Sequence, residues 1–259
     1  MLPSLLILLL FSSSLLLTSC HNDKSDDSSI ELTISAAASL NEVLTEIKGV
    51  YEADNPNIDL TLNFAGSGSL AQQIEQGADV DLFLSASPRY TSNLIDKNLA
   101  DAASLTPLLK NEIVLVTNVN STLDKIDFGG LGEATYDKIG IGEPGSVPAG
   151  QYAEEILTHY NISDKVYERA VFAKDVKEVL SWVETNNIDL GIVYSTDAIN
   201  SNEIRILASA PENSHTLILY PAVILKGSKH YDQTMAFLKF LTKEKATSIF
   251  KKYGFTPAY

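Results

Sequence analysis

The sequence predicts an α/β fold with mainly parallel sheets. From about residue 30 onward, short apolar runs typical of strands alternate with segments whose apolar residues recur at helical spacing. Small or hydroxyl-bearing residues stand at several points where a strand passes into a helix. Such alternation favours parallel strands, because each parallel pair needs a crossover that a helix usually provides.

The first half of the chain sets this pattern. Strands are expected over residues 32–37, 58–64 and 81–85, and helices over 40–54, 70–76 and from Pro88 onward. Ser39 followed three residues later by Glu42 is the capping-box pattern of a helix start. The segment 55–57, Asn-Pro-Asn, separates the first helix from the second strand.

The second half continues the alternation. Strands are expected over residues 112–117, 138–142, 190–194, 204–208 and 217–225, and helices over 148–160, 175–184, 231–241 and 243–253. Pro148 stands where proline is favoured, at the first position of a helix. No internal repeat interrupts this order, so the pattern indicates one large domain or two lobes.

The N-terminus predicts export and a lipid anchor. Residues 5–17, LLILLLFSSSLLL, form an apolar run that suits a signal peptide better than a membrane-spanning helix. The following Leu17-Thr18-Ser19-Cys20 resembles the lipobox of bacterial lipoproteins, which implies cleavage before Cys20 and its lipidation. We therefore expect a signal peptide over 1–19 and a lipidated flexible tether over 20–29. The protein would be an exported lipoprotein facing the periplasm or the cell exterior.

Charge and cysteine content exclude several classes of site. Cys20 is the only cysteine, so the mature chain has no internal disulfide and no thiolate zinc site. The formal net charge of −14 argues against nucleic acid, whose phosphates need a basic surface. A small anion stays possible, because backbone N–H groups at helix starts can hold one locally.

The junctions between strands and helices are the candidate binding site. In open α/β sheets, ligands lie outside the carboxyl ends of the strands, where helix N-termini present unpaired N–H groups. Four such junctions fall at residues 37–39, 66–69, 147–150 and 174–176. Each also has a plain structural explanation: Ser39 or Asp175 as a helix cap, 66–69 as an ordinary loop and 147–149 as a normal helix start. For Tyr194, at the end of an apolar strand, that explanation is core packing.

Taken together, the segments resemble a known family. The resemblance runs from about residue 32 to 255 and rests on short motifs in order: AAASL (36–40), FAGSGSL (64–70), DLFLSA (81–86), GEP (142–144), VPAGQYA (147–153), DV (175–176), LGIVY (190–194), DA (197–198), YP (220–221) and FKKYGF (250–255). These are similar to the periplasmic molybdate-binding proteins of ABC transporters. The resemblance implies the type II periplasmic-binding fold, with two lobes joined by a hinge.

The resemblance also implies the site and its partners. The family's contacts fall on Ser39, Ser67, Ala149, Val176 and Tyr194, which would bind molybdate or tungstate as an oxyanion through hydroxyl and backbone N–H groups. Residues 30–109 and 223–259 would form lobe one, and residues 110–222 lobe two. An ABC transporter permease would be the partner of a monomer, and no cofactor is implied.

Two alternatives stay open at this stage. The ligand could be another oxyanion, such as sulfate or phosphate, or a small organic anion. An enzyme is the other class, but the sequence has no recognisable metal-ligand cluster or nucleophile–base pair, and its four histidines are scattered along the chain. We therefore expect a binding protein and no catalytic residues.

Overall fold

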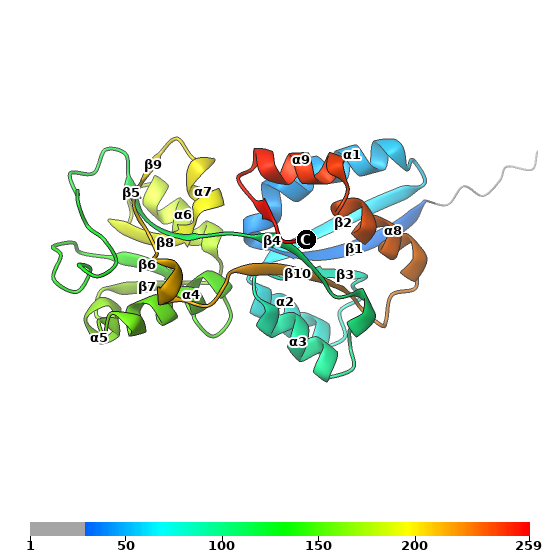
Figure 1. The fold of residues 1–259 in the computed structure, drawn as a ribbon, viewed down its shortest axis with the longest axis horizontal. Coiled ribbons are helices and arrows are strands. Elements are labelled where there is room, and N and C mark those ends of the chain that lie inside the picture. Colours follow the sequence, from blue (N-terminus) through cyan, green and yellow to red (C-terminus); the bar gives the residue numbers. More distant parts are fainter. Residues whose placement is uncertain (1–28) are drawn as a thin grey trace, which may run out of the picture.

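The computed structural model describes residues 29–259. The expected signal peptide, Cys20 and all of the expected tether except Ser29 lie outside these residues. The described chain forms two α/β lobes, each built on its own sheet (Figure 1). Among its helices, none is long and apolar enough to cross a membrane.

Lobe one is built on a six-stranded sheet with the order β11-β4-β10-β3-β1-β2. Its strands are β1 (Ile30–Ala37), β2 (Ile58–Ala65), β3 (Leu82–Leu84), β4 (Thr106–Lys110), β10 (Leu219–Ile224) and β11 (Thr256–Pro257). Its helices are η1 (Ala38–Leu40), α1 (Asn41–Asp54), α2 (Ser67–Glu75), α3 (Pro88–Asp96), η2 (Ala102–Ser104), α8 (Tyr231–Leu241) and α9 (Glu244–Lys252). Helices α1, α8 and α9 cover one face of the sheet, and α2 and α3 cover the other (Figure 1).

Lobe two is built on a five-stranded sheet with the order β7-β6-β8-β5-β9. Its strands are β5 (Ile113–Asn118), β6 (Ile139–Gly142), β7 (Ala170–Ala173), β8 (Leu190–Tyr194) and β9 (Ile204–Ser209). Its helices are α4 (Pro148–His159), α5 (Ser163–Tyr167), α6 (Val176–Glu184), α7 (Ser195–Ile199) and η3 (Glu212–Ser214).

Both sheets are mixed, where mainly parallel pairing was expected. β1 runs parallel to β2 and β3, and β6 runs parallel to β7 and β8. Each antiparallel pair includes a strand next to one of the two crossings between the lobes: β4 pairs with β10 and β11, and β10 with β3, in lobe one, and β5 pairs with β8 and β9 in lobe two. β10 spans the expected lobe boundary at 222/223 and lies entirely in lobe one's sheet, so the second crossing is the segment 210–218.

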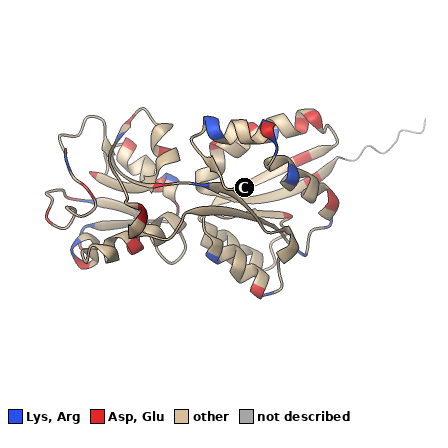
Figure 2. Ribbon diagram, viewed as in Figure 1, with Lys and Arg blue, Asp and Glu red and all other residues tan. Residues whose placement is uncertain are grey.

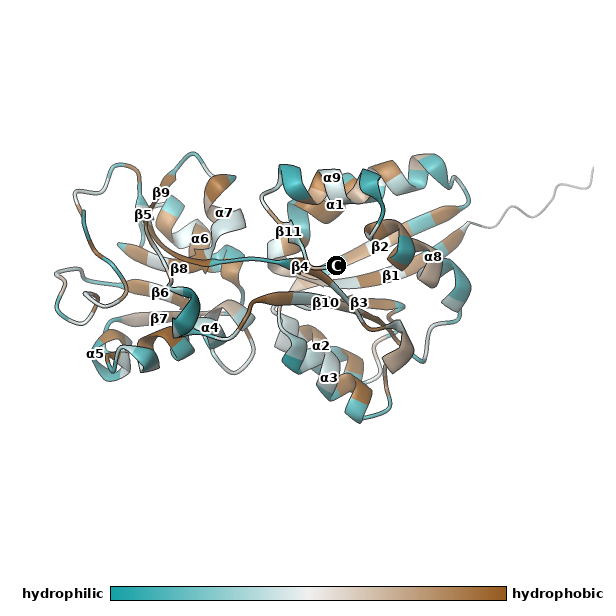
Figure 3. Ribbon diagram, in the orientation of Figure 1, coloured by the Kyte–Doolittle hydropathy of each residue, from teal (hydrophilic) through white to brown (hydrophobic). Residues whose placement is uncertain are grey.

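The core of each lobe follows the predicted apolar pattern. In α1 the helical spacing places Val43, Leu44, Ile47 and Tyr51 on one buried face against the sheet. All residues of β5 and β8 are buried, as expected for strands covered by helices on both faces. Figure 3 shows the same division, with mostly hydrophobic strands and hydrophilic outer faces on α1, α8 and α9.

Candidate ligand-binding site

The five residues named from the sequence line one cavity between the lobes. Ser39 and Ser67 come from lobe one, and Ala149, Val176 and Tyr194 come from lobe two. The remaining lining residues are mostly small: Ala37, Ala38, Ala65, Gly66, Ala86, Val147, Pro148 and Asp175. The cavity has a volume of about 10 Å³. That is far below the roughly 300–1,000 Å³ of pockets for drug-sized ligands, so with the lobes in contact the cavity suits only a very small ligand.

Four helix starts meet at this cavity. Ser67 and Val176 are the first residues of α2 and α6, Ala149 is the second residue of α4, and Ser39 lies in η1 directly before α1. The N–H groups of a helix's first turn have no acceptor within the helix. Each helix start also carries a partial positive charge. The backbone alone therefore presents several donors and a favourable field to an anion.

The hydroxyl groups of Ser39 and Ser67 are held by neighbours in lobe one. Ser67 Oγ accepts a hydrogen bond from the Ala86 N–H at 3.0 Å, which leaves the serine proton free for another acceptor. Ser39 Oγ lies 3.0 Å from the Tyr220 hydroxyl. Ser39 makes no side-chain cap at the start of α1, so the capping-box interpretation with Glu42 is wrong. Its hydroxyl belongs to the cavity and not to the helix end.

Tyr194 closes the cavity from lobe two at the end of β8. Its side chain is buried, and its ring packs edge-on against Tyr220 with centroids 5.6 Å apart. Yet its hydroxyl has no hydrogen-bond partner among the described residues. Burial raises the pKa of this phenol well above its usual range, so the proton stays in place. Core packing alone would leave a buried donor unpaired, at a cost of about 1–3 kcal/mol.

Glycines let the two lobes meet beside Ser67. The Gly68 N–H donates to the Ser146 carbonyl of lobe two at 2.8 Å. A Cβ on Gly68 would stand 2.7 Å from that same oxygen, and one on Gly66 would stand 2.7 Å from the Lys174 oxygen. Tyr90 also donates to the Gly145 carbonyl at 3.2 Å. The lobes are thus in contact across the cavity, and the glycines on either side of Ser67 make that approach possible.

The charged residues of the site are already paired. No lysine or arginine is among the described residues that line the cavity, and Asp175 is its one carboxylate. Asp175 Oδ1 accepts the Glu178 N–H at 2.9 Å, and Glu178 Oε2 accepts the Lys174 N–H at 3.0 Å. Asp175 is therefore the N-cap of α6, which confirms the helix-cap explanation for this residue, and Glu178 reaches back to the residue before the cap. Figure 2 shows the other charges spread over the helices of both lobes.

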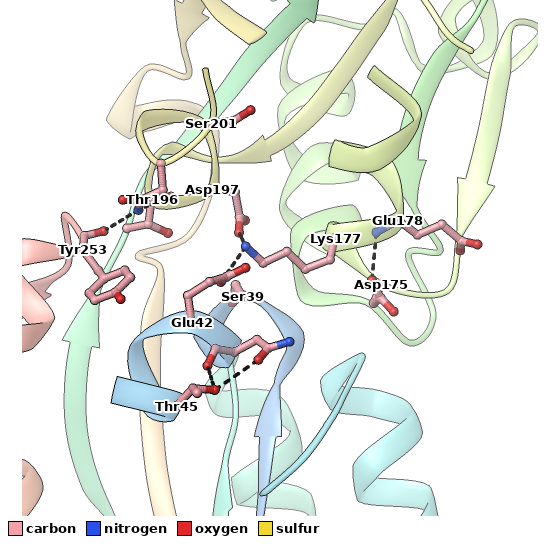
Figure 4. A network of polar contacts seen from close by, with 12 residues as sticks. Ser39, Glu42, Thr45, Asp175, Lys177, Glu178, Thr196, Asp197, Ser201 and Tyr253 are labelled. Carbon is pink, nitrogen blue, oxygen red and sulfur yellow. Dashed lines mark hydrogen bonds and ion pairs between the residues drawn. The ribbon is translucent and has the colours of Figure 1, made fainter. Parts of the chain in front are cut away.

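A lysine beside the cavity joins the lobes through two carboxylates (Figure 4). Lys177 Nζ lies 2.8 Å from Asp197 Oδ1 in lobe two and 2.9 Å from Glu42 Oε2 in lobe one. Burial raises the pKa of Asp197, against the opposing effect of the ammonium. Burial alone would lower the pKa of Lys177, but the two carboxylates together hold it above its usual value. The lysine's charge is therefore neutralised, and a bound anion would meet neutral donors.

Sequence reasoning missed three residues that build this site. Ala86 supplies the N–H that orients Ser67, Tyr220 contacts Ser39, and Asn111 at the first crossing contacts Tyr220. Ala86 and Tyr220 were part of the family resemblance but carried no role, and Asn111 was not singled out. Nothing in the spacing of these residues reveals their contacts, since they are distant in sequence. Three histidines fall within the described residues, and none of them lines the cavity.

Comparison with known proteins assigns the family. Residues 32–256 match the family described as bacterial extracellular solute-binding protein. The chain belongs to this family. The match covers both lobes and all five residues named from the sequence.

Three similar proteins show the degree of sequence and structural similarity. A putative ABC transporter substrate-binding lipoprotein of Bacillus subtilis is 42% identical, over 93% of this chain and 94% of that protein. A molybdate-binding protein of Haemophilus influenzae is 38% identical, over 88% of this chain and 91% of that protein. The solved substrate-binding domain of a putative molybdenum ABC transporter from Clostridium difficile is 41% identical, with a TM-score of 0.69, covering 89% and 100% of the two chains. The expected type II periplasmic-binding fold is confirmed.

Proposed function

We propose that this protein captures molybdate or tungstate outside the cytoplasm and delivers it to an ABC transporter permease. The observation that carries the proposal is the cavity between the lobes, where four helix starts and three hydroxyl groups meet and where no lysine or arginine is among the described lining residues. The likeness to a molybdate-binding protein, at 38% identity over most of both chains, supports the choice of ligand.

The proposed contacts are hydrogen bonds from neutral groups. Backbone N–H groups of Ser39, Ser67, Ala149 and Val176 would donate to the oxygens, and so would the hydroxyls of Ser39, Ser67 and Tyr194. A buried dianion without partners costs tens of kcal/mol in idealised estimates. Hydrogen bonds to a charged group contribute about 1.5–3 kcal/mol each, so a set of this size can offset much of that cost. No further cofactor enters this proposal.

Closure of the lobes would couple binding to transport. The ligand would contact Ser39 and Ser67 of lobe one together with Ala149, Val176 and Tyr194 of lobe two. A ligand that binds both lobes favours the closed form, because it binds that form better than the open one. We propose that the lobes move about the crossings at 111–112 and 210–218, and that the permease recognises the closed monomer.

The proposed role is carriage and not catalysis. The two cavity serines contact a phenol and a backbone N–H, and in the part of the chain that the structure describes neither makes a hydrogen bond to a base that could activate it as a nucleophile. Within the described residues no group of three or more histidine, cysteine, aspartate or glutamate side chains is arranged to hold a metal ion. A molybdenum atom would thus be bound only through the oxygens of its oxyanion.

Another tetrahedral oxyanion is the second candidate ligand. A ring of neutral donors suits sulfate as it suits molybdate, because both are dianions without a proton. The small residues of the lining are what would set the size of the ligand, since they fix how near the backbone donors approach. The cavity is too small for most organic anions unless the lobes open.

Native mass spectrometry after dialysis against molybdate tests the proposal directly. The expected result is one oxyanion on each chain, lost when Ser39 and Ser67 are both replaced by alanine. If the measured mass shows no bound molybdate, and calorimetry under the same conditions also records no binding, the proposed function is refuted. Added esters and phosphoesters should remain unchanged by the purified protein.

The membrane anchor is proposed to be lipid on Cys20. Support comes from the apolar run before Cys20 and from the 42% identical relative, which is named a lipoprotein. Cys20→Ala should abolish lipidation and move the protein from the membrane fraction to the soluble fraction. Immunoblots of the fractions and the mass of the mature N-terminus measure this. Unchanged membrane association of the variant would contradict the anchor.

A further inference from the structure

Asn111 lies at the first crossing between the lobes, and its amide has an unambiguous orientation. The Glu112 N–H, which can only donate, lies 2.9 Å from Asn111 Oδ1. The oxygen side of the amide is therefore fixed, and it also accepts from the Ser195 hydroxyl at 3.1 Å. The other side must be the NH₂ group, which has two protons to donate.

Both of those protons are used. Asn111 Nδ2 lies 2.9 Å from Thr196 Oγ1 in lobe two and 3.1 Å from the Tyr220 hydroxyl in lobe one. Because an amide nitrogen is not an acceptor, Tyr220 must accept this bond. Of the groups within hydrogen-bond distance of this phenol among the described residues, Ser39 Oγ at 3.0 Å is then the one that can accept its proton.

The direction of each bond fixes the next. Ser39 Oγ accepts from Tyr220, so the serine's own proton is free to point at the cavity. Burial raises the pKa of Tyr220 well above its usual range, so this phenol keeps its proton. Asn111 and Tyr220 themselves do not line the cavity, and they touch the ligand only through Ser39.

We propose that Asn111 and Tyr220 are positioning residues that hold Ser39 as a hydrogen-bond donor and thereby set the site's preference for oxyanions without a proton. This inference rests on the proposed function and deepens it. A ligand oxygen that carries a proton needs an acceptor, and a Ser39 held as a donor offers it none. Molybdate would be favoured over hydrogen phosphate at this position.

Asn111→Asp tests the proposal, because it keeps the shape and reverses the direction of the bonds. The carboxylate would accept from Tyr220, so Tyr220 could no longer donate to Ser39. Ser39 would then donate to Tyr220 and turn its lone pairs toward the ligand. Molybdate and hydrogen phosphate are both dianions at mildly alkaline pH, so the added charge of the variant affects the two ligands alike.

The expected result is a change in the ratio of the two affinities, measured by competitive calorimetry. The molybdate-to-phosphate affinity ratio should fall at least tenfold in Asn111→Asp and by a smaller factor in Tyr220→Phe. Tyr220→Phe removes the hydrogen-bond partner of Ser39 but does not force the Ser39 hydroxyl to point away from the ligand. Ser195→Ala is the matched control: it removes a bond to Asn111 but leaves the path to Ser39 intact, so the ratio should stay as in the parent.

The outcomes separate the inference from the proposed function. Equal losses of both affinities in Asn111→Asp would overturn the inference, since charge alone would explain them. An unchanged ratio in folded Asn111→Asp and Tyr220→Phe would overturn it as well. Should Asn111→Asp fail to fold, Tyr220→Phe and Asn111→Ala decide the matter, each expected to lower the ratio. A parent protein that binds no molybdate would refute the proposed function instead.

Discussion

Tyr194 shows how a single side chain carries both packing and function. Its ring fills space between the lobes against Tyr220, while its hydroxyl faces the cavity without a partner in the described residues. Because this buried phenol keeps its proton, its hydroxyl can donate a hydrogen bond to a ligand in the cavity. Without a ligand, the site therefore carries the free-energy cost of an unpaired buried donor, which a hydrogen bond to a bound oxyanion would remove.

Tyr194→Phe isolates that hydroxyl. Molybdate binding should weaken by about 1–3 kcal/mol, because one donor to the anion is lost. The stability of the ligand-free protein should be unchanged or slightly higher, because the unpaired polar group is gone. Calorimetry and thermal unfolding measure the two quantities.

Tyr136→Phe is the matched control for this substitution. The Tyr136 hydroxyl is also buried and has no hydrogen-bond partner within residues 29–259, but Tyr136 does not line the cavity. Its replacement should leave molybdate affinity unchanged. Equal molybdate affinity in Tyr194→Phe and the parent would mean that Tyr194 is a packing residue only.

At this scale the sequence predicts backbone contacts better than side-chain partners. The five lining residues follow from helix starts and family motifs, which are local in sequence. The partner of Ser39 does not: Glu42 lies three residues away and fits a local pattern, whereas Tyr220 lies 181 residues away and is the true contact. A long-range hydrogen bond leaves no periodic mark in one sequence.

Helix α2 illustrates the scale of whole elements, because its first turn is part of the contact between lobes. It begins at Ser67, three residues before the predicted start at 70, so Ser67, Gly68 and Ser69 belong to the helix and not to a loop. Gly68 donates to Ser146 across the cavity, at a distance that leaves no room for a side chain.

Gly68→Ala should weaken binding without harming the helix. Alanine favours a helix over glycine by about 1 kcal/mol, so α2 itself should be no less stable. Its Cβ would lie 2.7 Å from the Ser146 oxygen in the closed form, so closure should be impaired. Molybdate affinity should fall at least tenfold, or about 1.4 kcal/mol.

Gly49→Ala in α1 provides the comparison. Gly49 is exposed, and a Cβ there would meet nothing within 4 Å. The substitution should raise stability slightly and leave affinity as it is. Parent-like affinity in Gly68→Ala would show that the observed contact between the lobes is not needed for binding.

Lys177 links three elements, α1, α6 and α7, through its two carboxylate partners. Lys177→Met would leave Asp197 buried beside a neutral side chain. Removing one partner of a buried ion pair costs about 3–5 kcal/mol, and the lower end applies here because the Lys177 side chain is 23% exposed. Lys229→Met is the control, since its pair with Asp79 is largely exposed and should contribute little.

The stability that Lys177→Met loses relative to the parent should depend on pH in a defined direction. The pKa of Asp197 is raised by burial, and without Lys177 it should rise further. A carboxyl whose folded-state pKa exceeds its unfolded value loses stability as pH rises from the unfolded pKa through the folded one. The deficit of Lys177→Met should therefore be small near pH 3.8 and grow toward neutrality. Urea unfolding of both proteins across this range measures it, and a deficit that shrinks toward neutral pH would contradict the assignment.

Several elements escaped the sequence, each for a physical reason. β4 contains Pro107, and a proline argues against a strand when only the sequence is considered. In the structure β4 nevertheless pairs with β10 and β11. α5 and α7 are only five residues long, too short to show a helical period. Antiparallel pairing at the crossings was missed because pairing direction is set by tertiary structure and not by local pattern.

On the scale of the molecule, an acidic chain is proposed to bind a dianion. Its formal net charge is −14, yet the described residues that line the cavity include one carboxylate, which already caps α6. The site would work by local dipoles: helix starts and hydroxyls act within a few ångströms, whereas surface charges beyond about 8–10 Å are screened at ordinary ionic strength. Lobe one contributes Ser39 and Ser67 to the cavity lining and lobe two contributes Ala149, Val176 and Tyr194, so neither lobe could supply the proposed donors alone.

Competitive calorimetry with molybdate, tungstate and sulfate is the most direct measurement of this account. Hydrogen bonds weaken once donor and acceptor depart from about 2.7–3.2 Å, so a ring of donors fixed on two closed lobes selects its ligand by size. Molybdate and tungstate, nearly equal in size, should bind tightly and compete closely. Sulfate is smaller, leaves some donors unmet, and should bind at least about a hundredfold more weakly, or about 2.7 kcal/mol. Comparable affinity for sulfate would contradict the account, because the cavity would then be a general oxyanion site.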